Sequence, residues 1–244
     1  MKSKYGIIIR GENRQVQIDS HNQVMCCLGK RTIRMSGGIT SNNEGYSQEF
    51  KIPPHPNTKL LAISPKHAFI RITSRIVNNE MKAVYISQPC YDSEGVVDIY
   101  EFGDQPNNIF NEKYGLVVKN SKTKKTVYNS NWGILKIVDY FIVSQKENMD
   151  YPLPNIKDLA FVFGGGMAGI CEDGFEGALM ETFIRREGNV LQIRYKESIK
   201  WATNVAGEEI SRFPATCLVV DVGNINRVFV TNNNSFKDKI LLYY

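Results

Sequence analysis

The residue pattern best suited to chemistry is the glycine-rich stretch FVFGGGMAGICEDG, residues 161–174. Glycines after a strand can hold a phosphate group against backbone N–H groups. A phosphate loop also needs a Lys-Ser or Lys-Thr pair after the glycines, and a dinucleotide site needs a helix at that point. Here the glycines lead to Met167 and then to acidic residues. We therefore expect a glycine loop that packs closely or contacts a partner subunit.

Three carboxylates follow the glycines within five residues: Glu172, Asp173 and Glu176. Such a cluster can bind calcium, or supply the acid and base of a glycoside hydrolase, if the carboxyl groups are correctly separated in space. The sequence does not give that separation. We expect a solvated acidic loop, and a hydrolase acting on glycan or cell wall is the least favoured functional hypothesis.

Other nucleophiles and metal ligands are scattered along the chain. No serine lies in a nucleophile-elbow context, and no C-x-x-C spacing is present, so neither a zinc site nor a disulfide framework is indicated. The residues concerned are His21, His55 and His67, and Cys26, Cys27, Cys90, Cys171 and Cys217. We interpret the cysteines as reduced thiols in a core, and we predict no catalytic residue, no cofactor and no metal.

Composition favours a folded, water-soluble protein made in the cytoplasm. The 244 residues are 42% hydrophobic and 11% aromatic, which is enough to form a core. The most apolar stretch, GILKIVDYFIV, carries Lys136 and Asp139, so no membrane span is expected. The net charge of +5 is mild, and its one basic cluster (Lys122, Lys124 and Lys125) falls in a predicted turn. Nucleic-acid binding is therefore not expected.

The elements that must position these residues are predicted to be strands. Short β-branched or alternating runs are separated by Gly, Asn, Pro and Ser, a pattern typical of an all-β, sandwich-like fold with little helix. Within NVLQIRYK, residues 189–196, Leu191 and Ile193 alternate with polar residues. The segment 196–210 has a weak helical pattern. Further strands are predicted at 67–72, 81–87, 96–102, 159–163, 217–222 and 227–231.

The sequence of one predicted strand pair occurs twice in the chain. KYGIIIRGENRQVQIDSHN (4–22) returns as KYGLVVKNSKTKKTVYNSNW (113–132), with one residue more in the polar middle. We predict two β-hairpins, 5–20 and 114–130, in which an Asx side chain ends the second strand and a glycine marks a bulge. The matched residues are Tyr5 and Tyr114, Gly6 and Gly115, Asp19 and Asn129, and Ser20 and Ser130.

Proline-rich stretches suggest how the chain is divided. KIPPHPN, residues 51–57, is expected to cross between two strands. SQKENMDYPLPN, residues 144–155, is the longest polar stretch with prolines. We place the main boundary there, giving a β-sandwich at 1–145 with both hairpins and a second β-rich region at 146–244, whose ability to fold separately is left open.

The paired Tyr-Gly hairpins, followed by the hydrophobic segment GILKIVDYF, resemble those of small tail-associated structural proteins of tailed bacteriophages. The resemblance covers about residues 4–143 and involves no catalytic residue. It implies a virion protein of the tail, at its surface or at a fibre attachment site, without enzymatic activity. The partners it implies are other tail proteins and copies of the same chain arranged in a ring.

A second hypothesis is a carbohydrate-binding module that recognises glycan on the host surface. Aromatic rings exposed together on one face would favour this function, whereas aromatic rings buried in packing would favour assembly. The candidate rings are those of Tyr46, Tyr91, Tyr151, Phe175 and Trp132.

Overall fold

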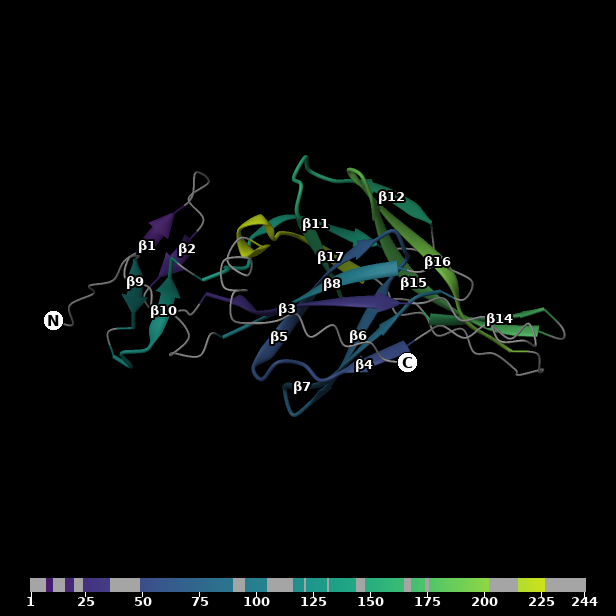
Figure 1. The fold of residues 1–244 in the computed structure, drawn as a ribbon, viewed down its shortest axis with the longest axis horizontal. Coiled ribbons are helices and arrows are strands. Elements are labelled where there is room, and N and C mark those ends of the chain that lie inside the picture. Colours follow the sequence, from purple (N-terminus) through teal and green to yellow (C-terminus); the bar gives the residue numbers. More distant parts are fainter. Residues whose placement is uncertain are drawn as a thin grey trace.

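A computed structural model describes residues 8–10, 16–19, 24–35, 49–89, 95–104, 116–120, 122–130, 132–143, 148–164, 168–173, 176–201 and 215–226. For 8–10, 16–19, 49–50, 168–173, 176–180 and 197–201, only the backbone is described. The described part of the chain is all-β, as predicted, with a single helical turn at 223–226 (Figure 1).

The structure describes eight strands between residues 8 and 103. They are β1 (Ile8–Arg10), β2 (Val16–Asp19), β3 (Cys26–Met35), β4 (Glu49–Ile52), β5 (Thr58–Lys66), β6 (Arg71–Val77), β7 (Glu80–Ser87) and β8 (Gly95–Gly103).

The remaining described strands lie between residues 117 and 221. They are β9 (Val117–Lys119), β10 (Thr126–Asn129), β11 (Ile137–Val143), β12 (Met149–Pro152), β13 (Leu159–Gly164), β14 (Ala168–Asp173), β15 (Glu176–Glu187), β16 (Val190–Trp201) and β17 (Ala215–Asp221).

The strands form a sandwich around one main core. One layer has the order β3-β8-β5-β13-β17-β11, and the other contains β4-β7-β6 and β12-β16-β15. A parallel pairing between β5 and β15 links the layers, so that most of these strands belong to a single curled ten-stranded sheet. Side chains from both layers fill the core, among them Ile63, Ile86, Ile99, Phe161 and Ile193.

The strand period of two gives the first layer two buried faces. On β8, Val97 and Ile99 point into the sandwich, whereas Tyr100 and Phe102 point to its outer side. A second apolar cluster forms on that outer side, where Val222 and other residues after β17 cover the sheet.

The two halves repeat the same strand pairing. In the first half, β3 pairs β8, β8 pairs β5, β4 pairs β7 and β7 pairs β6. In the second half, β11 pairs β17, β17 pairs β13, β12 pairs β16 and β16 pairs β15, in the same order along the chain. Among the described strands, β14 alone has no counterpart. We call β1 to β8 the first repeat and β9 to β17 the second repeat.

The sequence shows this larger repeat as a short motif that occurs once in each repeat, where the two repeats meet. Residues 56–63 read PNTKLLAI and residues 154–161 read PNIKDLAF. Their last residues, Ile63 and Phe161, are paired where β5 meets β13 antiparallel. Matched positions therefore face each other across the junction, which relates the two repeats by an approximate two-fold axis.

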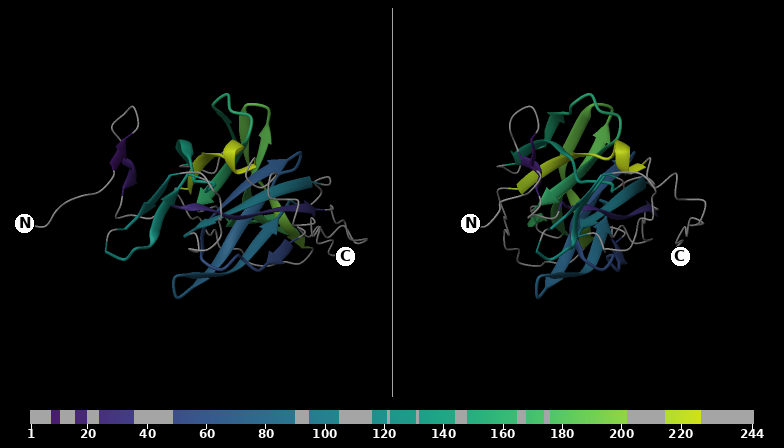
Figure 2. Two further views of the ribbon diagram at one scale, coloured as in Figure 1. Left: turned by 60° about the vertical axis from the view of Figure 1, so that its left-hand side comes forward. Right: turned by 90° about the vertical axis from the view of Figure 1, so that its left-hand side faces the viewer.

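Each repeat begins with one of the two predicted hairpins, and both hairpins are antiparallel. Ile8 pairs with Asp19 and Ile9 with Ile18, followed by a register shift. Val117 pairs with Asn129 and Val118 with Tyr128, followed by a shift at the same place. The second strands end at Asp19 and Asn129 as predicted. Both hairpins lie at one end of the molecule, beyond the sandwich (Figure 1, Figure 2).

The domain boundary expected near residue 145 does not coincide with the boundary between the two repeats. It falls between β11 and β12, and β11 is paired along its length with β17, far beyond that boundary. Residues on both sides of it share the main core. The described strands of 1–145 and 146–244 therefore form one folded body, because separating them would cut hydrogen-bonded strand pairs.

The expected helical turns near Trp201 are replaced by strand as far as the description reaches, since β16 continues to Trp201. The predicted strand at 227–231 lies outside the described residues. The alternation predicted in 189–196 is present, with Leu191 and Ile193 buried in the core.

Candidate functional site

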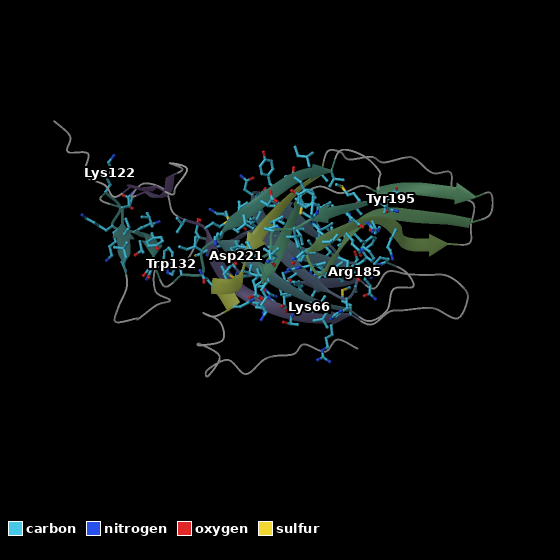
Figure 3. All side chains as sticks on the ribbon, turned by 90° about the horizontal axis from the view of Figure 1, so that it is seen from above. Lys66, Lys122, Trp132, Arg185, Tyr195 and Asp221 are labelled. Carbon is cyan, nitrogen blue, oxygen red and sulfur yellow. The ribbon has the colours of Figure 1, made fainter. Side chains whose placement is uncertain are left out.

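A polar cleft lies on the outer face of the first layer, between the two repeats. Its volume is about 410 Å³. The residues from the first repeat include Lys30, Ser64, Lys66, Asp98 and Tyr100. Those from the second repeat include Lys157, Asp158, Arg186, Gly188, Val222 and Asn226. Figure 3 shows Lys66 on the body of the molecule, far from Lys122 in the basic hairpin turn.

Asp98 is the buried anion of this cleft. Its carboxylate accepts a hydrogen bond of 2.6 Å from the Thr32 hydroxyl and lies 2.9 Å from Lys66 Nζ and 3.3 Å from Lys30 Nζ. Burial alone would raise the pKa of Asp98, but the hydrogen bonds from Thr32 and Lys66 and the two lysine charges outweigh burial and lower it. Asp98 is therefore a fixed negative charge at neutral pH.

Tyr100 and Asn226 connect the sheet to the helical turn after β17. The Tyr100 hydroxyl donates to Asn226 Oδ1 at 3.0 Å, and Lys30 Nζ donates to the same oxygen at 3.2 Å. Burial, with the nearby charge of Asp98, raises the pKa of Tyr100, so its hydroxyl stays protonated and remains a donor. Residues from β3, β8 and the C-terminal side of β17 thus form one hydrogen-bonded group.

Arg186 forms the opposite wall of the cleft. Its guanidinium donates to three backbone carbonyls, those of Ile156, Lys157 and Gly188, over 2.7 to 2.9 Å. These bonds fix the turn that carries Lys157 and Asp158. Gly188 lies in the turn between β15 and β16 with a φ of 57°, a conformation that glycine adopts without strain.

The strand period explains why these side chains share one face. Lys30 and Thr32 alternate on β3, and Asp98 and Tyr100 alternate on β8. Register places Thr32 opposite Asp98 and Lys30 opposite Tyr100. Each pair therefore projects from the same side of the sheet, away from the main core.

The second repeat places apolar residues at the matched positions. Leu218 and Val220 on β17 correspond to Asp98 and Tyr100 on β8, since they lie beside the matched β13 and β5 positions. Their partners on β11 are Tyr140 and Ile137, where β3 has Thr32 and Lys30. The same surface of the fold is thus charged in one repeat and apolar in the other.

Several of these apolar side chains on β11 face solvent. Ile137, Tyr140 and Ile142 are 50%, 66% and 56% exposed. Asp139 between them uses one carboxylate oxygen to accept the backbone N–H of Tyr140 at 2.8 Å and the other to accept the Tyr151 hydroxyl at 3.1 Å. Among the described strands, β11 lies at the edge of its sheet. A carboxylate that accepts a backbone N–H on such a strand discourages pairing with another strand, so a partner would contact the side chains of β11.

Of the hairpin residues singled out by sequence, Asn129 and Ser130 have described side chains, and neither is among the residues that line the cleft. Ser130 closes the second hairpin, because its Oγ accepts the Leu116 N–H at 3.0 Å and its own N–H donates to the Leu116 carbonyl. In the turn of this hairpin, Asn120 Oδ1 accepts hydrogen bonds from Lys122 N and Thr123 N. The remaining predicted hairpin residues, Tyr5, Gly6, Ser20, Tyr114 and Gly115, lie outside the described residues.

The glycine motif leads into a strand. β13 precedes the glycines, and β14 follows from Ala168, where a dinucleotide site would require a helix. The predicted acidic loop is the end of a β14–β15 hairpin. Backbone register places Asp173 opposite Glu176 and Glu172 opposite Gly177.

The thiols of the described cysteines are buried and form no disulfide with one another: Cys26, Cys27 and Cys217. Burial raises the pKa of Cys27 to about 12 and also raises that of Cys217, so both are protonated at neutral pH and poorly nucleophilic. Within the described ranges, no group of three His, Cys, Asp or Glu residues is placed to hold a metal ion.

Histidines and aromatic residues give little support to a catalytic or stacking site. His67 lines the cleft, and the backbone N–H of His55 donates a hydrogen bond to the Glu101 carboxylate. Trp132 is buried, and Tyr151 stacks on Phe141 at a centroid separation of 3.9 Å. Among aromatic side chains that the structure describes, Tyr140 is the exposed one. His21, Tyr46, Tyr91 and Phe175 lie outside the described residues.

No protein-family model, curated protein or solved structure matches this chain. The described residues contain no helix with the length and hydropathy needed to cross a membrane. Sequence reasoning missed the cleft because its residues come from six separate parts of the chain. The repeated PN-x-K-x-LA segment was the available signal, since it marks the junction at which the cleft forms.

Proposed function

We propose that this chain is a structural protein of a bacteriophage tail that acts by assembling with other tail proteins and with copies of itself. The observation that carries the proposal is the row of exposed apolar side chains on β11: Ile137, Tyr140 and Ile142. Large apolar groups that gather on one strand are typical of surfaces that bind a partner.

The fold supports this function in a second way. A sandwich with a broad, rigid surface suits a protein that packs against neighbours. The hairpins project beyond the sandwich, and Leu116 and Val117 at the second hairpin are 45% and 46% exposed. The resemblance of the hairpins to those of phage tail proteins suggests that this assembly takes place in a phage tail.

Light scattering on the purified chain, alone and mixed with candidate tail proteins, tests the proposal. We expect a defined oligomer or a stable complex. The double variant Tyr140→Lys with Ile142→Lys should reduce that mass toward the monomer, because it places charge on the apolar row. Ile76→Lys is the matched control, since Ile76 is 60% exposed on β6, away from this row.

A chain that stays monomeric and binds none of the candidate tail proteins would contradict the assembly function. Equal loss of mass in the β11 variant and the Ile76 control would show that the β11 surface is not the contact. In the first case a glycan panel becomes the next measurement, because surface glycan is the alternative partner.

A further inference from the structure

We propose that the cleft between the two repeats binds a small molecule that carries one anionic group and several hydroxyl groups, such as a phosphorylated or acidic sugar. This site is separate from the β11 surface, and the proposal does not depend on the assembly function.

The charge of the cleft favours an anion. Lys30, Lys66, Lys157 and Arg186 line it against the carboxylates Asp98 and Asp158, a formal excess of two positive charges. Asp98 is already paired with Lys30 and Lys66. Lys157 is exposed at the cleft and, within the described part of the chain, its ammonium makes no ion pair or hydrogen bond. Lys157 is thus available to an anionic ligand.

Three further side chains that line the cleft can form hydrogen bonds with hydroxyl groups of a ligand. The Ser64 hydroxyl and the Asp158 carboxylate have no hydrogen-bond partner among the described residues, and both line the cleft. The Asn226 oxygen accepts from Tyr100 and Lys30, which leaves the amide N–H₂ of that side chain as a donor. A ligand with hydroxyls can donate to Asp158 and accept from Ser64 and Asn226.

The second repeat shows that the fold does not require these polar groups. At the matched positions, Leu218 and Val220 replace Asp98 and Tyr100, and the same strand pairing forms. Burying an ion pair has a desolvation cost that apolar residues of similar size avoid. The polar set is therefore an addition to the fold, as expected for a binding site.

The walls of the cleft are fixed before a ligand arrives. Arg186 is held by three backbone carbonyls, and Asp98 is held by Thr32, Lys30 and Lys66. Fixed groups lose little freedom on binding. A volume of about 410 Å³ also falls within the range of small-molecule sites.

Isothermal titration of the intact chain tests the proposal with four probes: glucose 6-phosphate, glucuronate, inorganic phosphate and glucose. We expect the two anionic sugars to bind more tightly than glucose, with affinity falling as salt rises. Lys157→Glu should weaken that binding by about tenfold or more, because it removes a charge-assisted bond and adds repulsion.

Lys59→Glu is the matched control. Lys59 holds the same place in PNTKLLAI as Lys157 holds in PNIKDLAF, is exposed, and does not line the cleft. This control should bind the anionic sugars like the parent chain. Both lysines are on the surface, so thermal melting of each variant should stay close to that of the parent, with a small loss for Lys59→Glu because it breaks the exposed ion pair with Asp104.

Three results would overturn the proposal. The first is no heat of binding from either anionic sugar at millimolar concentration, and the second is equal weakening by Lys59→Glu and Lys157→Glu. The third is inorganic phosphate binding as tightly as glucose 6-phosphate, which would show that the cleft binds phosphate alone and does not recognise a hydroxylated molecule.

Discussion

Glu101 is a carboxylate buried in the sandwich at the end of β8. It pairs with Arg31, and it accepts the Thr58 hydroxyl at 2.9 Å and the His55 N–H. These contacts attach the proline-rich crossing at 53–57 to the sheet. Glu101→Ala should destabilise the protein by about 3 kcal/mol in urea unfolding, because it leaves the Arg31 guanidinium and the His55 backbone N–H without their buried partner.

An exposed carboxylate provides the comparison for Glu101. Asp104 pairs with Lys59 at 2.6 Å, but both side chains are about half exposed. Asp104→Ala should therefore cost less than about 1 kcal/mol, as solvent-exposed ion pairs do. Equal losses in the two variants would contradict the role assigned to Glu101.

Asp98 gives stability a specific dependence on pH. Its pKa is lower in the folded protein than in the unfolded chain, so the ionised form stabilises the fold above the unfolded pKa of about 4. This contribution is lost as pH falls through the folded pKa. In urea unfolding between pH 6 and pH 3, Asp98→Asn should show a smaller loss of stability than the parent. An unchanged slope would contradict this.

At the scale of elements, the end of β8 leaves no room for a side chain. A Cβ on Gly103 would lie 2.1 Å from the Asn57 carbonyl oxygen and 3.0 Å from Leu28 Cδ1. Because the first contact is backbone, Gly103→Ala must move the crossing at 53–57. We expect a loss of about 1 to 3 kcal/mol, measured by thermal or chemical unfolding.

Gly29 on β3 is the matched control, because a Cβ there meets nothing within 4 Å. Gly29→Ala should leave stability unchanged or raise it slightly, since alanine loses less backbone entropy than glycine on folding. A Gly103 variant as stable as the Gly29 variant would show that the crossing adjusts without cost.

Elements with a clear period could be predicted from sequence. Leu191 and Ile193 alternate with polar residues, and β16 forms there. The strand β5 was not predicted, because Leu60, Leu61 and Ala62 run together and Pro65 interrupts the pattern. Both faces of β5 are buried, so it shows no alternation of apolar and polar residues.

The candidate site was beyond the reach of local patterns. Lys30, Asp98 and Asn226 are far apart in the sequence; pairing of β3 with β8 brings the first two together, and the helical turn after β17 brings Asn226 to them. The glycine and acidic motifs looked more chemical because their residues are neighbours in the chain. Sequence did indicate a duplication through the hairpins, although the duplication extends through the whole sandwich.

At the scale of the whole molecule, the first repeat depends on the second to cover the edge of β5. In the intact chain, β13 pairs with that edge at Ile63. A fragment of residues 1–112 exposes the edge and keeps PNTKLLAI, which is similar to the missing PNIKDLAF. We expect the fragment to dimerise, with two β5 strands meeting in place of β5 and β13.

Size-exclusion chromatography with light scattering measures the mass of this fragment, and hydrogen exchange at residues 58–66 reports whether the edge is protected. A stable monomer that unfolds cooperatively would contradict the dependence of one repeat on the other. The full chain is the control, because its β5 edge is already paired.

The replacement of charged by apolar residues between matched positions gives the molecule a direction. Two identical halves would show every surface feature twice, and such a particle would look the same after half a turn. In this chain the outer face carries Asp98 and Tyr100 in the first repeat but Leu218 and Val220 in the second, and the exposed apolar side chains of β11 lie in the second repeat. A row of such molecules joined front to back is a polar filament or ring, whose two ends or rims differ chemically.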